Sequence, residues 1–289
     1  MAKILKGIGG FYYVTTDESE NIIECKARGR FRNLSLKPYV GDNVDIELSD
    51  EGKGSILNIH SRKNCFIRPP VANIDSLVIV CSCHNPEPDF GFIDKMLVIC
   101  ASKNVEAILC LNKTDLAFDE EIEEIAGIYR KIGIQVVKTS NESNNGIEEL
   151  KELLNNKITA FSGFSGVGKS TLLNNILGIE SLETGEVSKK IGRGRHTTRH
   201  VELMRFRGGY VIDTPGFGSL EIGDIGPDEL KNYFPEFEKF EADCRFPGCN
   251  HLGTKFCGVY DAATSGAIAE SRYENYKEFY KFLKDKREW

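Results

Sequence analysis

A glycine-rich loop carries the most specific chemical signal in the sequence. Gly163 to Ser170 reads GFSGVGKS, which matches the pattern G-x-x-x-x-G-K-[ST], between an apolar run and a helical pattern. Glycines let backbone amides wrap phosphates closely, while Lys169 would reach the β- and γ-phosphates and the Ser170 hydroxyl would bind Mg²⁺. The loop therefore predicts a nucleoside triphosphate site.

Two further motifs add to this site. Val211 to Gly216 reads VIDTPG, in which Asp213 could hold Mg²⁺ through water and the Gly216 amide could sense the γ-phosphate. The tetrapeptide NKTD, Asn112 to Asp115, follows the apolar stretch EAILCL. A carboxylate there can accept both N1–H and the 2-amino group of guanine, a donor pair that adenine lacks. The alternative for NKTD is a polar turn that caps a helix, but beside a phosphate loop guanine specificity is favoured.

A cysteine and histidine cluster near the C-terminus has metal-ligand spacing. It reads C-x₄-C-x-H-x₅-C and consists of Cys244, Cys249, His251 and Cys257. Three thiolates and one imidazole suit a closed, tetrahedral, structural Zn²⁺ site; the alternative is free cysteines beside a surface histidine. The other six of the nine cysteines are scattered in apolar contexts, so we expect free thiols and a reducing, cytoplasmic location.

The elements that must position these groups fall into three stretches. Up to Ile67, short alternating runs separated by turn-formers predict a small antiparallel barrel. From Ile74, apolar strands alternate with amphipathic helices, as in a parallel, helix-flanked sheet of an α/β domain. Beyond Gly226 the pattern is helical and aromatic. The expected domains are 1–67, 68–225 and 226–289, with a boundary near the Pro69-Pro70 pair.

Charge and hydropathy limit the possible partners. The net charge is −6, yet the segment 26–37 has five basic residues and no acid, and the segment 189–207 has seven basic residues against one glutamate. Arginines and an aromatic ring in the first segment offer phosphate contacts and a stacking surface; they are Arg28, Arg30, Phe31 and Arg32. The alternative is a solvated basic strand on a structural barrel. The longest apolar run is too short to cross a bilayer, and the N-terminus has no signal-peptide h-region, so we expect neither export nor a membrane span.

The order of the motifs, base then phosphate then switch, is unusual, because ordinary GTPases place the base motif last. The chain thus resembles a circularly permuted G domain. Together with CKARGRFR, RKNCFIRPPVANID, GRGRHTT and the cysteine cluster, it resembles the RsgA/YjeQ family of GTPases that depend on the small ribosomal subunit. The resemblance implies an oligonucleotide-binding (OB) type barrel, a permuted P-loop GTPase domain and a C-terminal helical zinc-binding domain.

The resemblance also implies roles for individual residues. Guanine would be held by Asn112, Lys113, Thr114 and Asp115, and phosphates and Mg²⁺ by Gly163, Phe164, Ser165, Gly166, Val167, Gly168, Lys169, Ser170 and Thr171. Thr197 or Thr198 would close a switch on the γ-phosphate, with Asp213 and Gly216 in the second switch. Where a Ser-Ala step usually presents an amide to guanine O6, this chain has Ser140-Asn141.

The function implied is a GTP hydrolase that binds the small (30S) ribosomal subunit and its rRNA and leaves on hydrolysis, during late maturation of that subunit. GTP and GDP, Mg²⁺ and one Zn²⁺ would be its ligands, and we expect a monomer. One alternative is a P-loop ATPase or small-molecule kinase, which NKTD disfavours. Another is a nucleic-acid-binding module whose nucleotide site only switches conformation.

The residue that follows Gly216 bears on mechanism. Ras-like GTPases have a glutamine there that orients the attacking water, whereas this chain has Phe217, which cannot form a hydrogen bond with its side chain. Without a partner, the enzyme should therefore hydrolyse GTP slowly. His196, beside the switch threonines, is the candidate for positioning water; alternatively it contacts phosphate or RNA.

Overall fold

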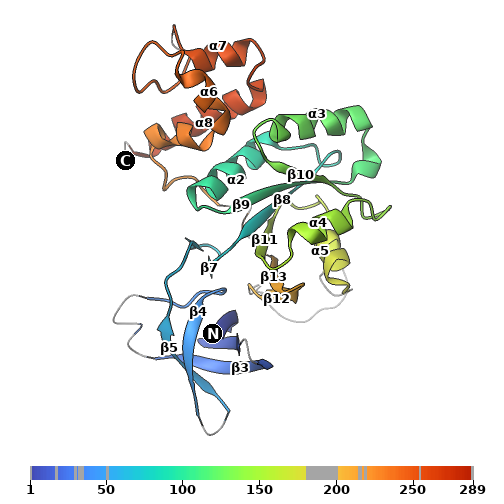
Figure 1. Cartoon of the computed structure of the whole chain (residues 1–289), viewed down its shortest axis with the longest axis vertical. Coiled ribbons are helices and arrows are strands. Elements are labelled where there is room, and N and C mark those ends of the chain that lie inside the picture. Colours follow the sequence, from blue (N-terminus) through green and yellow to red (C-terminus); the bar gives the residue numbers. More distant parts are fainter. Residues whose placement is uncertain are drawn as a thin grey trace, which may run out of the picture.

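The computed structural model describes residues 2–16, 19–28, 31, 36–49, 52–179, 201–213, 217, 220–253 and 255–287. Figure 1 shows a five-stranded barrel at one end of the molecule, a helix-flanked sheet in the middle and a group of helices at the other end. The permuted α/β architecture with flanking barrel and C-terminal helices is the one expected from the sequence.

The barrel consists of β1 (Ala2–Ile8), β2 (Phe11–Thr16), β3 (Ser19–Ala27), β4 (Asn43–Leu48) and β5 (Gly54–Ile59). It closes in the order β1-β2-β3-β5-β4, and all pairs are antiparallel except β3 with β5. Alternation along these strands buries one face; the fully buried side chains are Ile4, Val14, Cys25, Val44 and Ile56. A closed barrel leaves no unpaired sheet edge, so partners must use its outer face or its loops.

One expectation for the barrel is wrong. Phe31 is 5% exposed and packs in the barrel core, so it offers no stacking surface to a nucleobase. Arg28, just after β3, forms an ion pair with Glu47, which partly neutralises the start of the basic segment 26–37. The prediction of a stacking surface failed because an aromatic residue between arginines can point either inward or outward. Burial of the large apolar surface of the ring favours the inward position.

The central sheet has the order β10-β9-β8-β11-β13-β12. Its strands are β8 (Ser76–Ser82), β9 (Glu106–Asn112), β10 (Gln135–Lys138), β11 (Ile158–Ser162), β12 (Leu203–Phe206) and β13 (Gly209–Asp213). All neighbours are parallel except the β12–β13 hairpin. β8 is buried along its whole length, as expected of a central strand covered by helices on both faces.

Four helices cover this sheet. α2 (Phe90–Ser102) and α3 (Asp119–Arg130) pack on one face, and α4 (Ile147–Leu153) and α5 (Lys169–Leu177) pack on the other. Asp89 caps α2 by accepting a hydrogen bond from the Phe92 amide at 2.8 Å. The two faces bury separate apolar clusters.

The joint between the barrel and the sheet is built from side-chain amides. The Asn64 carboxamide donates to Ile74 O at 2.8 Å and accepts from Ile74 N at 2.9 Å, and Asn73 Nδ2 donates to Gly41 O at 3.0 Å. Both asparagines are buried. Between them β6 (Cys65–Phe66) pairs with β7 (Val71–Ala72). The segment near the two prolines is therefore a structured joint.

A second contact joins the barrel to the edge of the sheet. Lys6 on β1 forms a bridge and an ion pair, at 3.3 Å, with Glu202, and Arg205 on β12 donates to Thr15 Oγ1 at 2.6 Å. The hairpin that carries Asp213 thus touches the barrel.

The C-terminal segment contains η3 (Pro227–Tyr233), η4 (Pro235–Phe237), α6 (Glu238–Glu241), α7 (Gly258–Thr264) and α8 (Glu270–Arg287). The stretch PDELKNYFPEF forms two 3₁₀ helices, because Pro235 lacks an amide hydrogen and turns the chain at Phe234. α8 packs against α2 and η3. Among the described residues, no helix is both long and apolar enough to cross a membrane.

Arg272 of α8 is the centre of a buried polar cluster. It is 1% exposed; it donates to Asp94 of α2 at 2.8 Å and, through two nitrogens, to Glu236 of η4 at 2.7 and 3.0 Å. Asn275 Nδ2 donates to the second Asp94 oxygen at 2.7 Å. This cluster ties the C-terminal helices to a helix of the central sheet.

Candidate functional site

The three motifs found in the sequence meet at one edge of the central sheet. Asn112 ends β9, Ser162 ends β11 just before the glycine-rich loop, and Asp213 ends β13. These strands run parallel, so their carboxyl ends lie at the same edge. Ligands of open α/β sheets bind in the crevice beyond that edge.

Asn112 connects the base motif to the phosphate loop. Its side chain is fully buried; Nδ2 donates to Val167 O at 2.8 Å, and Oδ1 accepts from Thr139 Oγ1 at 3.0 Å. Burial raises the pKa of Cys110, whose thiol lies 3.2 Å from Thr139 Oγ1, to about 12. The thiol is therefore neutral at physiological pH, and no negative charge lies behind the base motif from this side.

The Asp115 carboxylate is oriented from the neighbouring strand. It lies in the short helix η1 (Thr114–Leu116), and Ser140 Oγ donates a hydrogen bond to its Oδ1. Lys113 has a left-handed backbone (φ 60°), and its Nζ donates to Asn85 O at 2.7 Å. Lys113 and Asp115 are thus each held by a partner outside the motif.

Two glycines of the phosphate loop are required by close contacts. A Cβ on Gly163 would lie 2.6 Å from Val80 O, and a Cβ on Gly168 would lie 2.5 Å from Asn112 Nδ2. Gly168 also has a φ of +87°, which favours glycine. The loop therefore passes tightly over β8 and β9 and leads directly into the N-terminus of α5, where amides and the helix dipole attract anions.

Lys169 and Asp213 form an ion pair across the phosphate site. Both side chains are largely buried, with 14% and 20% exposed. The lysine that would reach phosphates thus has a carboxylate partner from the second switch motif, and Ser170 follows it at the start of α5. Phe164, at the tip of the loop, is 44% exposed and packs on Phe92, with ring centroids 4.3 Å apart.

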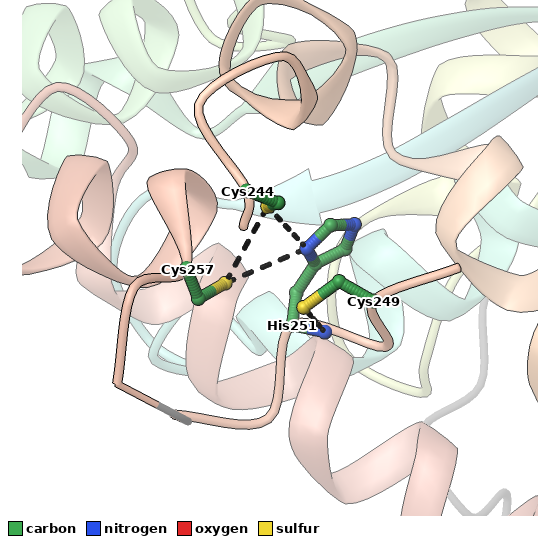
Figure 2. Close-up of side chains that lie close together, drawn as sticks. All are labelled: Cys244, Cys249, His251 and Cys257. Atoms are coloured by element: carbon green, nitrogen blue, oxygen red, sulfur yellow. Dashed lines mark hydrogen bonds between the residues drawn. The ribbon is translucent and has the colours of Figure 1, made fainter. Parts of the chain in front are cut away.

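A second site lies in the C-terminal segment. Figure 2 shows the side chains of Cys244, Cys249, His251 and Cys257 converging on one point, and their ligand atoms all lie within 4.8 Å of one another. The Cys244 and Cys257 sulfurs lie 3.6 and 3.5 Å from His251 Nδ1 and 4.0 Å from each other. A tetrahedral Zn²⁺ site with arms of about 2.1 to 2.3 Å has edges of about 3.4 to 3.8 Å. The four residues can therefore hold a metal ion.

Glu241 orients the histidine of this cluster. His251 Nε2 lies 3.0 Å from Glu241 Oε1, so it can donate there and leave Nδ1 free to face the sulfurs. A carboxylate on the far nitrogen is the usual partner of a metal-bound histidine. The histidine is 1% exposed, and its ring packs edge-on against Phe237.

Family sequence models match most of the chain. The model described as RsgA GTPase matches residues 59–223, and the model described as RsgA N-terminal domain matches residues 2–56. The chain belongs to the RsgA GTPase family. GTP hydrolysis is therefore its activity, and the Mg²⁺ that accompanies GTP in this family is expected with it.

Relatives agree with this membership over their whole length. The small ribosomal subunit biogenesis GTPase RsgA of Alkaliphilus metalliredigens is 46% identical over 290 residues, covering 99% of both chains. The protein of the same name from Caldanaerobacter subterraneus is 47% identical over 98% of this chain and 96% of its own.

Two solved structures share the fold. YjeQ from Thermotoga maritima has a TM-score of 0.84 at 40% identity and covers 98% of this chain and 97% of its own. YloQ, described as a circularly permuted GTPase, has a TM-score of 0.81 at 35% identity, over 98% of this chain and 94% of its own. The permuted motif order of this RsgA-family GTPase is thus shared by solved relatives.

Some of the switch residues of this RsgA-family GTPase lie outside the described residues: His196, Thr197, Thr198 and Gly216. Phe217 is described and fully buried, with its ring 5.0 Å from that of Phe66. Its side chain therefore points into the core at the joint with the barrel.

The sequence analysis assigned no role to three side chains that support the sites. Thr139 and Ser140 hold Asn112 and Asp115, and Glu241 holds His251. For two of them the sequence held an indication, because Thr139 and Ser140 directly follow a predicted strand and so lie at the sheet edge that carries the site. Glu241 precedes Cys244 by three residues, but nothing in that spacing indicates its partner.

Proposed function

We propose that this RsgA-family GTPase hydrolyses GTP in the maturation of the small ribosomal subunit, binds that subunit and its rRNA, and leaves on hydrolysis. The observation that carries the proposal is the meeting of the base, phosphate and switch motifs, in permuted order, at one sheet edge. The names of its relatives support the ribosomal role, and its nine free cysteines support a cytoplasmic location.

Guanine would be recognised by NKTD and its supports. The Asp115 carboxylate accepts N1–H and the 2-amino group, Asn112 fixes the distance between base and phosphate loop, and Lys113 covers the base. Because Ser140 orients Asp115 and Val167 O anchors Asn112, the two recognition groups are placed before the nucleotide arrives. Preorganisation of this kind reduces the entropy lost on binding.

The phosphates would replace Asp213 as the partner of Lys169. Loop amides from Gly163 to Gly168 and the α5 N-terminus face the same space. The Ser170 hydroxyl and, through water, the Asp213 carboxylate would hold Mg²⁺, which would supply neutralising charge on the phosphates. With nucleotide bound, Asp213 would exchange its ion pair with Lys169 for this role. Thr197 or Thr198 and the Gly216 amide would complete the γ-phosphate contacts.

Free enzyme should hydrolyse GTP slowly. Phe217 is buried against Phe66, so it neither orients water nor occupies the phosphate site. We propose that His196 positions the water when the ribosomal subunit is bound.

The cysteine cluster would hold one structural Zn²⁺. Its donor set of three sulfurs and one nitrogen, its edge lengths and the Glu241 partner of His251 all fit a closed tetrahedral site. When bound, the ion would cross-link loops that otherwise have little apolar core; it leaves no open position for a catalytic water.

The three proposed domains would have separate roles: residues 1–67 would bind RNA, residues 68–225 would bind and hydrolyse GTP, and residues 226–289 would bind zinc. The barrel would contact rRNA through Arg28, Arg30 and Arg32, without a contribution from Phe31. The expectation of a monomer stays a prediction.

The test measures hydrolysis of GTP and of ATP by the full chain, with and without purified small subunits. We expect slow turnover of GTP alone, a large increase with small subunits and no comparable turnover of ATP. Equal turnover of ATP would contradict the guanine site. GTP turnover that small subunits leave unchanged would contradict the ribosomal role and favour a nucleotide-dependent switch.

A further inference from the structure

Phe164 is the only aromatic side chain in the phosphate loop GFSGVGKS. The pattern G-x-x-x-x-G-K-[ST] leaves its position open to any residue, so contacts to phosphate do not require a ring there. The side chain is 44% exposed. A role for this ring must therefore come from what it touches in the folded protein.

Both ends of the loop are fixed by contacts with neighbouring strands. Gly163 lies so close to β8 that a Cβ would be 2.6 Å from Val80 O. At the other end, Val167 O accepts a hydrogen bond from Asn112 Nδ2 at 2.8 Å, and the Val167 side chain is buried. Between these ends lie three exposed residues, Phe164, Ser165 and Gly166. Because glycine gives a short segment many accessible backbone conformations, this tip needs a contact of its own to keep one shape.

The Phe164 ring supplies such a contact by packing on α2. Its centroid lies 4.3 Å from that of Phe92, and the two ring planes are inclined by 42°. An aromatic pair at this separation is more favourable than its buried area alone would make it. The helix thus covers part of the ring and holds the tip of the loop from outside the loop.

α2 is a rigid support for this ring. Phe92 is 4% exposed, and its amide donates to the Asp89 carboxylate at 2.8 Å in the first turn of the helix. One turn further along, Met96 is fully buried, and its sulfur accepts a hydrogen bond from Ser162 Oγ at 3.7 Å. Ser162 ends β11 directly before the loop. The helix therefore borders the loop both where it begins and at its tip.

Phosphate binding requires the tip of the loop to keep one shape, in which its amides face the same space. A loop that also populates other shapes binds more weakly, in proportion to the fraction in the competent shape. We propose that Phe164 is a positioning residue for phosphate binding, because its packing on Phe92 holds the tip in the shape that binds the β-phosphate. It acts through the loop amides and not by touching the nucleotide. This inference rests on the phosphate site proposed above.

The test compares two nucleotides that differ only in the β-phosphate. Affinities for GDP and GMP are measured by competition with a fluorescent GDP analogue for wild type, Phe164→Ala and Phe164→Tyr. We expect Phe164→Ala to bind GDP about tenfold more weakly, as when the competent shape falls to about a tenth of the population, but GMP less than about twofold more weakly. Phe164→Tyr keeps the ring and can place its hydroxyl in water, so it should restore GDP affinity to within about twofold.

A second variant tests whether the effect runs through α2. Phe92→Leu keeps an apolar side chain in the core but removes the ring on which Phe164 packs. We expect it to weaken GDP binding about fivefold, and the double variant with Phe164→Ala to lose no more than Phe164→Ala alone, because residues that act through one contact are not additive. Losses that multiply in the double variant would contradict the proposal.

Phe282→Ala is the matched control, because Phe282 is 43% exposed but belongs to α8. Its GDP affinity should not change, and thermal melts verify that each variant folds. Equal losses for GDP and GMP in Phe164→Ala would show that the ring does not act on the β-phosphate, and unchanged GDP affinity would show that it serves a contact outside the nucleotide site; either result overturns the proposal. The phosphate site itself fails separately, if wild type does not prefer GDP to GMP.

Discussion

Asp115 is the residue on which base selectivity depends. Its carboxylate accepts from Ser140 Oγ and can accept two further hydrogens from guanine. We predict that Asp115→Asn loses at least tenfold in GTP affinity and gains affinity for xanthosine triphosphate, whose altered edge restores a matching set of donors and acceptors. Competition binding with GTP, XTP and ATP measures this. Wild type that binds ATP as tightly as GTP would disprove the assignment.

His196 is assigned to catalysis by sequence and by elimination, because Phe217 is buried and apolar. We predict that His196→Ala binds GTP and the small subunit nearly normally but loses about a hundredfold of the subunit-stimulated rate. Single-turnover assays with and without small subunits measure the loss. Arg193→Ala is the control for a contact to phosphate or RNA. Full stimulation of the histidine variant would point to a group supplied by the ribosome.

At the residue scale, the sequence predicted groups whose chemistry depends on local spacing. The phosphate loop and NKTD are contiguous, so their side chains could be assigned before the fold was known. Phe31 was assigned to the outside of the barrel, since its neighbours in sequence do not reveal which way its side chain faces. The contact of Asn141 with Asn112 could not be predicted either, because it depends on segments far apart in sequence meeting at one sheet edge.

At the scale of elements, the cysteine cluster holds the loop between α6 and α7, whose large apolar side chains Phe246, Leu252 and Phe256 are exposed. We predict that chelation, or Cys249→Ser, unfolds the C-terminal segment and leaves nucleotide binding largely intact, because metal binding energy is folding energy in such sites. Circular dichroism, nucleotide titration and elemental analysis of native protein test this. Protein purified without chelators that contains no zinc would contradict it.

The Arg272 cluster joins α8 to α2 and η4. We predict that Arg272→Met destabilises the protein by about 3–5 kcal/mol, because Asp94 and Glu236 then lose their buried cationic partner. Lys277→Met, which removes an exposed ion pair with Glu274 on the same helix, should cost about 0.5 kcal/mol or less. Urea unfolding of both variants gives the comparison. A small effect of Arg272→Met would mean that apolar packing alone holds α8.

Element types were largely predictable, whereas the contacts between elements were not. The alternation of strands and helices after Ile74 follows from periodicity, and the sheet was expected from it. Arg272 and Asp94 lie 178 residues apart in sequence, and neither sits in a recognisable motif. An isolated aspartate in an apolar helix such as α2 indicates a buried partner, but it does not identify which arginine supplies it.

At the scale of the whole molecule, the joint between barrel and sheet sets how the two move together. Gly41 has a φ of +90°, and a Cβ there would lie 2.2 Å from Ala72 O. We predict that Gly41→Ala loosens the joint, so that limited proteolysis releases the barrel while GTP binding persists. Gly10→Ala is the control, because it shares a positive φ (+85°) but has nothing within 4 Å. Equal protease resistance of both variants would contradict a rigid joint.

The permuted strand order also sets the sequence of events during synthesis. Of the strands of the central sheet, β8 leaves the ribosome first, and it later lies between β9 and β11. The half that carries NKTD can therefore assemble while the other edge of β8, with its backbone amides and carbonyls still unpaired, waits for β11. At about 5–20 residues per second this wait is about 4 to 15 s. A nascent chain thus passes through a stage in which the base-recognition half is present and the phosphate loop is not yet made. In that stage β8 has an unpaired edge that is prone to aggregation, so β8 is the segment where chaperones would be needed most.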